Sequence, residues 1–383
     1  MITQYPVKII DLEVLRKNVA AVRATLPEQT QLLAVVKADA YGHGIVPVGR
    51  NALAAGASWL AVARTDEGLV LRKAGIQAPI LVLGASSVSE IAEGVCHGLT
   101  LTVSGPRMIH AVQECAMRVG KSGYVHLKID TGMGRIGVRT EEEVQAVLCA
   151  LQECPEVVLT GAFTHFADAD GEADDYTLMQ LKRFRELTAL LPGGIIRHCA
   201  NSAAIHRYPD AVMDMVRLGI SMYGYPPVES NCAIKPVMEW HTAVTHIKTV
   251  QPGDKISYGC TFTADRPMKL ATIACGYGDG YHRFATSKAE VLIHGQRCAV
   301  VGRICMDQMM ADVTNLENVK PGDTVILIGA CGDQAITADD LGAWCGTISY
   351  EVLLAATERV HRKWVNDCNE LRRNSVLSCA RNV

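Results

Sequence analysis

The stretch that decides the fold runs from residue 32 to residue 44 and reads Leu32-Leu33-Ala34-Val35-Val36-Lys37-Ala38-Asp39-Ala40-Tyr41-Gly42-His43-Gly44. Its first five residues are apolar and partly β-branched, which is typical of a short buried strand. Lys37 follows at the point where this strand leaves the core. Partial burial at such a position lowers the pKa of a lysine toward that of a nucleophilic amine. The alternative is a solvated lysine at a strand end, because lysine is seldom buried without a partner.

Around this stretch, short apolar runs alternate with longer amphipathic runs from about residue 12 to residue 225. The predicted strands are Leu32–Lys37, Trp59–Ala63, Ile80–Leu83, Leu99–Val103, Tyr124–Ile129, Val158–Phe163, Ile195–Cys199 and Met213–Leu218. Predicted helices include Glu67–Ala74, Val88–Cys96, Pro106–Val119, Glu141–Glu153 and Tyr176–Leu191. About eight strands and eight helices in roughly 210 residues match an α/β fold, the (β/α)₈ TIM barrel. An open doubly wound sheet is the competitor, but the sequence shows no G-x-G-x-x-G after the first strand, which disfavours a dinucleotide-binding version.

The second part of the chain has a different sequence pattern, with runs that are rich in β-branched residues and in which apolar and polar residues partly alternate. The predicted strands there are Thr242–Val250, Lys269–Ala274, Glu290–Ile293, Met309–Val313 and Thr324–Ile328. Two Pro-Gly-Asp sequences, at 252–254 and 321–323, predict turns between them. We therefore expect a barrel over residues 1–235, whose first residues pair with the other domain, and a mainly antiparallel β domain over residues 236–383.

Composition restricts the class of protein. The chain has 383 residues and a net charge of −3, so it presents no basic surface for nucleic acid or an anionic membrane. Its 14 cysteines are scattered without a C-x-x-C pair or a Cys/His cluster at zinc spacing, so no metal is expected. The first residues lack a signal-peptide pattern, and no run of about 18 apolar residues occurs. We expect a cytoplasmic enzyme that acts on a small molecule.

Polar residues gather where the predicted barrel strands end, which is where barrel enzymes hold their active sites. These residues are Lys37, Tyr41, Lys128, Asp130, Arg135, His165, Asn201, Ser202, Arg217 and Gly219. Each has a plain structural alternative: a helix N-cap for Ser202, a satisfied core histidine for His165, a surface ion pair for Arg217. Their joint placement at one end of a barrel favours a site.

The last two barrel strands suggest the kind of ligand. Barrels commonly bind phosphate after strands seven and eight, through loop N–H groups and a helix N-terminus. Ser202 offers a hydroxyl there, and Gly219 and Ile220 offer unhindered amides. A nucleophilic lysine facing a phosphate site predicts pyridoxal 5'-phosphate, bound as a Schiff base.

The chain resembles the alanine racemases, barrel-type (fold type III) pyridoxal-phosphate enzymes, essentially from end to end. The resemblance rests on seven motifs in the same order: 36–44, 128–135, 217–220, Ser257-Tyr258-Gly259, 276–280, 302–307 and 347–351. It implies that Lys37 binds the cofactor and acts as base on one face of the substrate Cα. It also implies that Tyr258, from the other subunit of a homodimer, is the base on the opposite face. The alternative for Tyr258 is a core tyrosine of the β domain.

The same resemblance implies roles for the other residues. Arg217 meets the pyridine nitrogen and is linked through His165 to Tyr258, and Arg135 meets the cofactor phenolic oxygen and the substrate carboxylate. The residues implied at the cofactor, chiefly at its phosphate, are Tyr41, Asn201, Ser202, Gly219, Ile220 and Tyr350. Met306 resembles a substrate-binding residue of the partner, and the residues of the access corridor are Tyr277, Arg303 and Asp307. Lys128 matches a lysine that is N-carbamylated in many relatives, the alternative being an unmodified surface lysine.

The expected activity is interconversion of L-alanine and D-alanine, which supplies D-alanine for cell-wall peptidoglycan. A serine or broad-specificity amino-acid racemase of the same family stays open, because an apolar pocket rejects one hydroxyl poorly. A pyridoxal-phosphate decarboxylase is disfavoured by the motifs at 217–220 and 257–259. A non-catalytic cofactor carrier is disfavoured by the 150 or so residues that follow the barrel.

Overall fold

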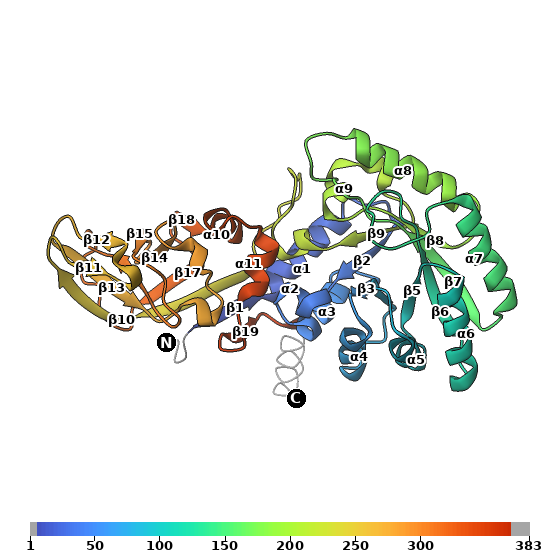
Figure 1. Ribbon diagram of the computed structural model, residues 1–383, viewed down its shortest axis with the longest axis horizontal. Coiled ribbons are helices and arrows are strands. Elements are labelled where there is room, and N and C mark those ends of the chain that lie inside the picture. The colour runs from blue at the N-terminus through green and yellow to red at the C-terminus, as the bar shows by residue number, and fades with distance from the viewer. Residues whose placement is uncertain (1–5, 369–383) are drawn as a thin grey trace, which may run out of the picture. The chain divides into compact units, whose positions relative to one another are not determined.

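The computed structural model describes residues 6–368, which form two compact units (Figure 1). The barrel unit comprises Leu15–Ala40 and Gly44–Lys235. The β unit comprises residues 6–14, Tyr41–His43 and residues 236–368. The chain therefore starts in the β unit, passes through the barrel unit and returns.

Eight parallel strands form the sheet of the barrel unit. They are β2 Gln31–Val35, β3 Trp59–Val62, β4 Ile80–Val82, β5 Thr100–Val103, β6 Gly123–Lys128, β7 Val157–Phe163, β8 Ile196–His198 and β9 Met215–Leu218. Their order is β8-β7-β6-β5-β4-β3-β2-β9. At the two ends of this order, the Arg217 N–H donates to the Ala200 carbonyl over 3.0 Å, so the barrel is nearly closed. The predicted barrel is confirmed.

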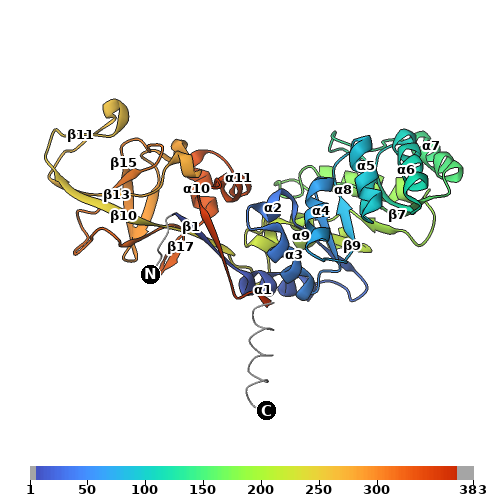
Figure 2. The same ribbon diagram turned by 90° about the horizontal axis from the view of Figure 1, so that it is seen from below.

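Helices cover the outside of these strands, as Figure 2 shows for α4 to α8. The helices are α1 Leu12–Arg23, α2 Lys37–Tyr41, α3 Ile45–Ala54, α4 Thr65–Lys73, α5 Val88–Cys96, α6 Pro106–Val119, α7 Glu141–Glu153, α8 Asp175–Thr188 and α9 Ser202–Arg207, with 3₁₀ turns η1 Pro209–Ala211 and η2 Ile220–Tyr223. Local sequence sets their ends. Ser87 and Glu90 form a capping box at the start of α5, and Gly120, in the left-handed conformation, ends α6.

One predicted strand extends beyond the end of the observed strand. The apolar run predicts a strand from Leu32 to Lys37, whereas β2 ends at Val35. The reason is that Lys37 already begins α2, whose residues 38–41 have positive φ. A strand cannot continue through this conformation, which ends the extended segment before the lysine.

The β unit contains a sheet of nine strands in the order β18-β17-β14-β15-β16-β13-β10-β1-β19, and a separate hairpin. The strands are β1 Val7–Asp11, β10 Met238–Val250, β13 Met268–Ile273, β14 Glu290–Ile293, β15 Gln296–Val301, β16 Met309–Asp312, β17 Thr324–Cys331, β18 Gln334–Ile336 and β19 His361–Val365, and the hairpin is β11 Lys255–Ile256 with β12 Phe262–Thr263. All pairings are antiparallel except that of β1 with β19. Helical segments are α10 Ala338–Cys345, α11 Ser349–Ala355, η3 Tyr258–Cys260, η4 Tyr277–Asp279 and η5 Arg283–Ala285.

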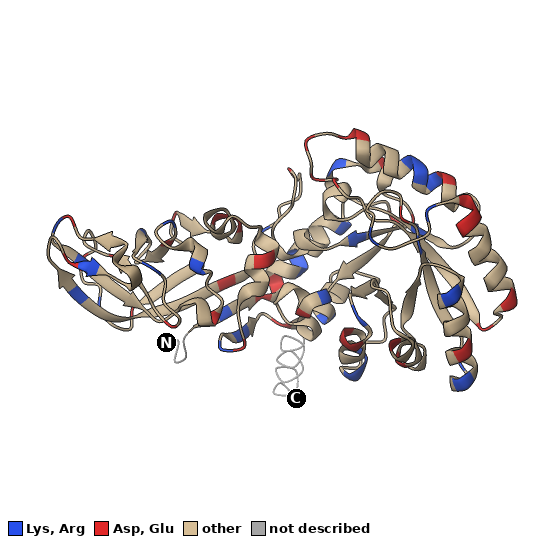
Figure 3. Ribbon diagram, viewed as in Figure 1, with Lys and Arg blue, Asp and Glu red and all other residues tan. Residues whose placement is uncertain are grey.

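Charged residues of both signs are interspersed along the helices of the barrel unit (Figure 3). Within residues 6–368, no helix has both the length and the apolar character needed to cross a membrane. The same residues contain no cluster of three or more His, Cys, Asp or Glu side chains able to hold a metal ion.

Candidate active site

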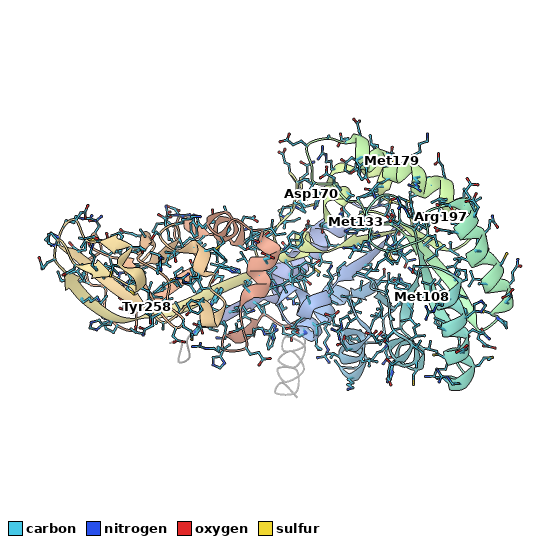
Figure 4. All side chains as sticks on the ribbon, viewed as in Figure 1. Met108, Met133, Asp170, Met179, Arg197 and Tyr258 are labelled. Carbon is cyan, nitrogen blue, oxygen red and sulfur yellow. The ribbon has the colours of Figure 1, made fainter. Side chains whose placement is uncertain are left out.

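The carboxyl ends of the barrel strands bring several predicted residues to one end of the barrel. Lys37 follows β2, His165 follows β7, and Arg217 lies in β9. The positive charges of Arg135 and Arg217 act on both Lys37 and His165, which places these four groups within electrostatic reach of one another. Arg135 lies in the same loop as Met133, which Figure 4 labels at the barrel. This end of the barrel is therefore rich in positive charge.

Lys37 is half-buried at this end. Burial lowers its pKa, and the charges of Arg135 and Arg217 lower it further, whereas the carboxylate of Glu67 acts in the opposite sense. A lysine with a lowered pKa is more often neutral near pH 7, and the neutral amine is both a nucleophile and a base. Lys37 is thus suited to bond with an aldehyde and to accept a proton.

The backbone after Lys37 forms a left-handed turn. Residues 38–41 have φ between 51° and 55°, although none of them is glycine. Each such residue costs roughly 1–2 kcal/mol. The N–H of Ile45 donates to Oδ1 of Asp39 over 2.8 Å, and the Ala40 N–H donates to the Val36 carbonyl over 2.9 Å. Strain of this kind at a functional lysine must be held by its surroundings.

Glu67, which the sequence pattern does not single out, is one of the groups that hold this turn. Its Oε1 accepts from the Ala38 N–H over 2.5 Å. Its Oε2 accepts from the N–H groups of Ala63 and Arg64 over 2.7 and 3.2 Å. One carboxylate thereby ties the left-handed turn after β2 to the loop after β3.

Arg217 is almost fully buried, which excludes the alternative of a surface ion pair. Burial lowers its pKa to about 10, so the guanidinium is still charged at neutral pH. It donates to the carbonyls of Thr164, Cys199 and His198 over 2.7, 3.0 and 3.0 Å. It also contacts Nδ1 of His165 at 3.3 Å and Nδ1 of His198 at 3.1 Å. Both terminal nitrogens of Arg217 thus have hydrogen-bond partners, and within the described chain its Nε–H is the donor without an acceptor.

His198 is a second residue that the sequence pattern does not single out. An arginine can only donate, so Nδ1 of His198 must accept and its single proton must lie on Nε2. Nδ1 of His165 lies 3.3 Å from the other terminal nitrogen of Arg217, the one that donates to the Thr164 and Cys199 carbonyls. Burial and the charge of Arg217 hold the pKa of both imidazoles well below the usual range. Both rings are therefore neutral, and both orient Arg217.

Two helical turns begin side by side after β8 and β9. Oγ of Ser202 accepts from the N–H of Gly219 over 2.9 Å and from that of Ser221 over 3.4 Å. Asn201, not Ser202, is the N-cap of α9, because its side chain accepts from the Ala204 N–H over 3.0 Å. N–H groups in the first turn of a helix lack intrahelical partners and favour anions. The hydroxyl of Ser202 and the N–H of Ile220 fit a phosphate group. The N–H of Gly219, expected to be unhindered, instead donates to Ser202 Oγ and orients that hydroxyl.

Lys128 is buried at the end of β6, where its Nζ donates to the Ile129 carbonyl over 2.9 Å. The alternative of a surface lysine is therefore wrong. Burial and the charge of Arg217 lower its pKa to about 7. Next to it, burial alone would raise the pKa of Asp130, but hydrogen bonds from the Gly134 and Gly132 N–H groups hold it below its usual value.

Tyr41 and Tyr350 belong to the β unit and lie close together, with ring centroids 6.0 Å apart. Tyr41 is buried, and burial raises its pKa. The glycine after it is required, because a Cβ at Gly42 would lie 2.5 Å from the Leu353 carbonyl oxygen. The two phenols thus form one cluster of hydroxyl donors, contributed by opposite ends of the sequence.

Tyr258 lies at the surface of the β unit, where Figure 4 labels it. Its side chain is 69 % exposed, so the alternative of a core tyrosine is wrong. The turn around it is constrained: Ser257, Gly259 and Cys260 all have positive φ. Oγ of Ser257 donates to the Arg303 carbonyl over 2.5 Å, and a Cβ at Gly259 would lie 2.7 Å from the Arg303 guanidinium. An exposed tyrosine on such a turn is presented outward.

The remaining predicted residues lie in two adjoining loops of the β unit. The N–H of Gly278 donates to the Met306 carbonyl over 2.7 Å, and that of Tyr277 donates to the Cys305 carbonyl over 3.1 Å. Arg359 joins both loops, contacting the buried Asp279 at 3.2 Å and Asp307 at 2.8 Å. Arg359 is absent from the predicted residues, because a lone arginine near the end of a chain has no sequence signature.

The predicted residues therefore fall into two sets. The barrel unit contributes Lys37, Lys128, Arg135, His165, Asn201, Ser202, Arg217, Gly219 and Ile220, and the β unit contributes Tyr41, Tyr258, Tyr277, Arg303, Met306, Asp307 and Tyr350. The first set combines an amine of lowered pKa, a buried guanidinium with one spare donor, and an anion cradle. These groups fit an aromatic phosphorylated aldehyde that has a ring nitrogen.

Comparisons with known proteins show which family the chain resembles. Residues 10–227 match the family model of the alanine racemase N-terminal domain, and residues 237–364 match that of the C-terminal domain. The alanine racemase of Desulforamulus reducens is 42 % identical over 364 residues, covering 93 % of this chain and 98 % of that protein. That of Geobacillus stearothermophilus is 43 % identical over 375 residues, covering 92 % of each.

Solved structures give the same result. The crystal structure of alanine racemase from Bacillus anthracis with bound L-Ala-P has a TM-score of 0.89 and 37 % identity, covering 96 % of each chain. The enzyme from Streptomyces lavendulae has a TM-score of 0.91 and 33 % identity, covering 97 % of this chain and 99 % of that one.

Proposed function

Since the chain belongs to the alanine racemase family and is an isomerase that acts on alanine, we propose that it uses pyridoxal phosphate and two bases. Lys37 is the base on one face of the substrate Cα, and the partner subunit's Tyr258 is the base on the other. The observation that best supports this proposal is the half-buried Lys37 of lowered pKa, at the barrel end where Arg217 has one spare donor.

The barrel unit fits the cofactor at three points. Lys37 would hold its aldehyde carbon, Ser202 and the N–H of Ile220 would hold its phosphate beside Gly219, whose N–H donates to Ser202 Oγ, and Nε–H of Arg217 would hold its ring nitrogen. Asn201 supports the phosphate cradle as the cap of α9. When bound, pyridoxal phosphate draws electrons from the substrate Cα and makes its proton removable. In the same proposal Tyr41 and Tyr350 add hydroxyl groups at the phosphate.

Two bases are needed because a racemase must remove a proton from one face and return one to the other. Each well-placed base contributes roughly 10²–10⁴-fold. Burial and neighbouring cations keep a fraction of Lys37 neutral, as a base must be. The partner subunit's Tyr258 is placed next to the neutral His165, which contacts the charged Arg217 and so links the tyrosine to that guanidinium.

Arg217 sets which reaction follows proton removal. An arginine is always charged near neutral pH and only donates, so it denies the ring nitrogen a proton of its own. A cofactor held by Arg217 in this way would be a weaker electron sink, so return of a proton to Cα would be favoured over side reactions. This favours racemisation over transamination.

The other predicted residues bind substrate and shape access. Arg135 and the backbone N–H of the partner subunit's Met306 bind the substrate carboxylate. Lys128, once N-carbamylated, gains a carboxylate that orients Arg135. Its pKa of about 7 supports this modification, because only a neutral amine reacts with carbon dioxide. The access corridor is formed by the partner's Tyr277, the partner's Arg303 and the partner's Asp307.

The exposure of Tyr258 supports a dimer. A tyrosine that is 69 % exposed on its own unit is presented to a second copy of the chain. A two-fold dimer then builds two equivalent sites from reciprocal contacts. Supply of D-alanine for peptidoglycan, a cytoplasmic location and a preference for alanine over serine remain predictions, and the rates of Cα deuterium exchange for L-alanine and L-serine test the last.

Borohydride reduction tests the covalent role of Lys37. Purified protein with pyridoxal phosphate should absorb in the visible range, and reduction should fix the cofactor to the peptide that contains Lys37. The Lys37→Ala protein should show no fixed cofactor and no racemisation. Label on any other peptide would contradict the assignment.

Subunit mixing tests the shared site. Lys37→Ala and Tyr258→Phe proteins should each be nearly inactive. After exchange in equal amounts half of the dimers are mixed, and one of the two sites in each mixed dimer is intact, so about a quarter of all sites should recover. No recovery after demonstrated exchange would mean that both bases come from one chain.

A further inference from the structure

His126 lies in the barrel interior next to His198. Its Nδ1 is 3.0 Å from Nε2 of His198, and both rings are completely buried. The other nitrogen of the same His198 ring contacts Arg217, whose terminal nitrogen is 3.1 Å from Nδ1 of His198. Three buried side chains, from β6, β8 and β9, are thus connected across the barrel.

The direction of each hydrogen bond among these three side chains is fixed by Arg217. Arg217 donates to Nδ1 of His198, so His198 holds its proton on Nε2. That N–H donates to Nδ1 of His126, and the proton of His126 must then lie on its own Nε2. Burial and the charge of Arg217 lower the pKa of His126 to about 3, so it too is neutral.

Packing alone does not explain a histidine at position 126. The ring is surrounded by apolar and aromatic groups, with Trp59 at a centroid distance of 5.5 Å, and Gly161 makes room for it, since a Cβ there would lie 2.6 Å from Nε2. Nε2 has no hydrogen-bond partner among the described residues. A leucine or phenylalanine would fill such a space without burying an unpaired N–H, which is unfavourable. The polar atom that His126 does use is Nδ1.

We propose that His126 is a positioning residue: by accepting from Nε2–H it stabilises the tautomer of His198 that accepts from Arg217, and thereby the orientation of Arg217. The inference rests on the proposed function, in which Arg217 faces the ring nitrogen of the cofactor. If the acceptor at position 126 is lost, the Nε2–H of His198 is buried without a partner. The other tautomer of His198 relieves this, but it turns an N–H toward Arg217, so two donors face each other and the guanidinium moves.

Two substitutions distinguish the effect of losing the hydrogen-bond acceptor at position 126 from the effect of losing the imidazole ring. His126→Asn keeps an oxygen close to the position of Nδ1, whereas His126→Leu removes the acceptor and fills the space. Trp59→Phe is the matched control. It alters the packing around His126 and leaves the side chains of His126, His198 and Arg217 unchanged.

The first readout does not require cofactor or activity. Nitrogen-15 NMR of protein labelled in histidine should show both His126 and His198 protonated on Nε2 alone. In His126→Leu, the His198 signals should shift toward protonation of Nδ1, and in His126→Asn they should not. A His198 with its proton on Nδ1 in the unsubstituted protein would overturn the proposal, even if no variant folds.

The second readout is the ratio of pyruvate formed to alanine racemised by the cofactor-loaded enzyme. Loss of one neutral hydrogen bond predicts about a tenfold fall in kcat and about a tenfold rise in this ratio for His126→Leu. His126→Asn should recover most of both, and Trp59→Phe should leave the ratio unchanged. If folded His126→Leu keeps both the ratio of pyruvate to racemised alanine and the tautomer of His198, the inference about His126 is refuted and the proposed function is not. If the unsubstituted protein binds no pyridoxal phosphate, the proposed function is refuted.

Discussion

Replacing Glu67 should loosen the left-handed turn that follows Lys37. In Glu67→Ala the N–H groups of Ala38, Ala63 and Arg64 lose their common acceptor. The turn contains four residues of positive φ, which together cost roughly 4–8 kcal/mol relative to ordinary conformations. The turn persists only while its surroundings outweigh that cost.

The size of the effect follows from the three bonds. Hydrogen bonds to a charged acceptor are worth roughly 1.5–3 kcal/mol each when buried, but two of these three lie in exposed surroundings. We therefore expect a loss of about 2–3 kcal/mol in the free energy that holds the turn. Because cofactor binding requires the turn, this loss should weaken the affinity for pyridoxal phosphate about 30- to 150-fold.

Glu67→Gln is the matched control, since it keeps one acceptor oxygen and removes the charge. Its affinity should fall less, about three- to tenfold. The Glu67 carboxylate also opposes the lowering of the Lys37 pKa. In both variants this pKa should therefore fall further, and the pH at which the apo protein begins to bond with the cofactor should fall with it.

Absorbance titration with pyridoxal phosphate gives the affinity of each variant for the cofactor. Repeating the titration across a range of pH gives the pKa of Lys37. Thermal unfolding shows whether each variant is folded. A folded Glu67→Ala protein that binds the cofactor within twofold of the unsubstituted protein would show that other contacts hold the turn, and the reasoning would be refuted.

Three further changes test separate parts of the site. Arg217→Glu should lower racemisation by a hundredfold or so, a loss of about 3 kcal/mol, and should raise pyruvate formation, measured enzymatically; an unchanged rate would exclude the proposed role of Arg217. With a pKa of about 7, about half of Lys128 is neutral at pH 7, against fewer than about one in a thousand for an ordinary lysine. Carbon-13 NMR with labelled bicarbonate should therefore show a carbamate that is lost as the pH falls from 8 to 6, and acetate should partly rescue Lys128→Ala. Arg359→Ala should separate the loops of Asp279 and Asp307, raising KM for alanine several-fold with less effect on kcat, and Arg359→Lys should recover part of this. Equal changes in KM and kcat would argue against substrate positioning by these loops.

The barrel strands could be predicted from sequence because each is a short apolar run next to an amphipathic one. The same holds for β14, whose predicted bounds, Glu290–Ile293, are those observed. β1 and β19 were not predicted as strands, although the first residues were expected to pair with the β domain; the two strands pair with each other from opposite ends of the described chain. Helices α10 and α11 were also missed, since they are short and interrupt a region of β-type pattern.

The site was predictable where a residue belongs to a motif. Glu67 and His198 were missed because their roles depend on hydrogen bonds to groups distant in sequence, such as Ala38 and Arg217. The left-handed turn was missed for a different reason. Ala38, Ala40 and Tyr41 have no preference for positive φ, and Asp39, the one residue of the four that has such a preference, does not predict a run of four.

The pairing of β1 with β10 and β19 also affects synthesis of the protein. β1 leaves the ribosome first, but both of its neighbours in the sheet follow the whole barrel unit. At roughly 5–20 residues per second, this strand waits for tens of seconds with unpaired edges. The barrel unit is continuous apart from three residues and is complete before the β unit begins to close. Nascent chains released before β19 should therefore contain a folded barrel unit with an unfinished β unit, and a circular permutant that places β1 after β19 should remove the delay.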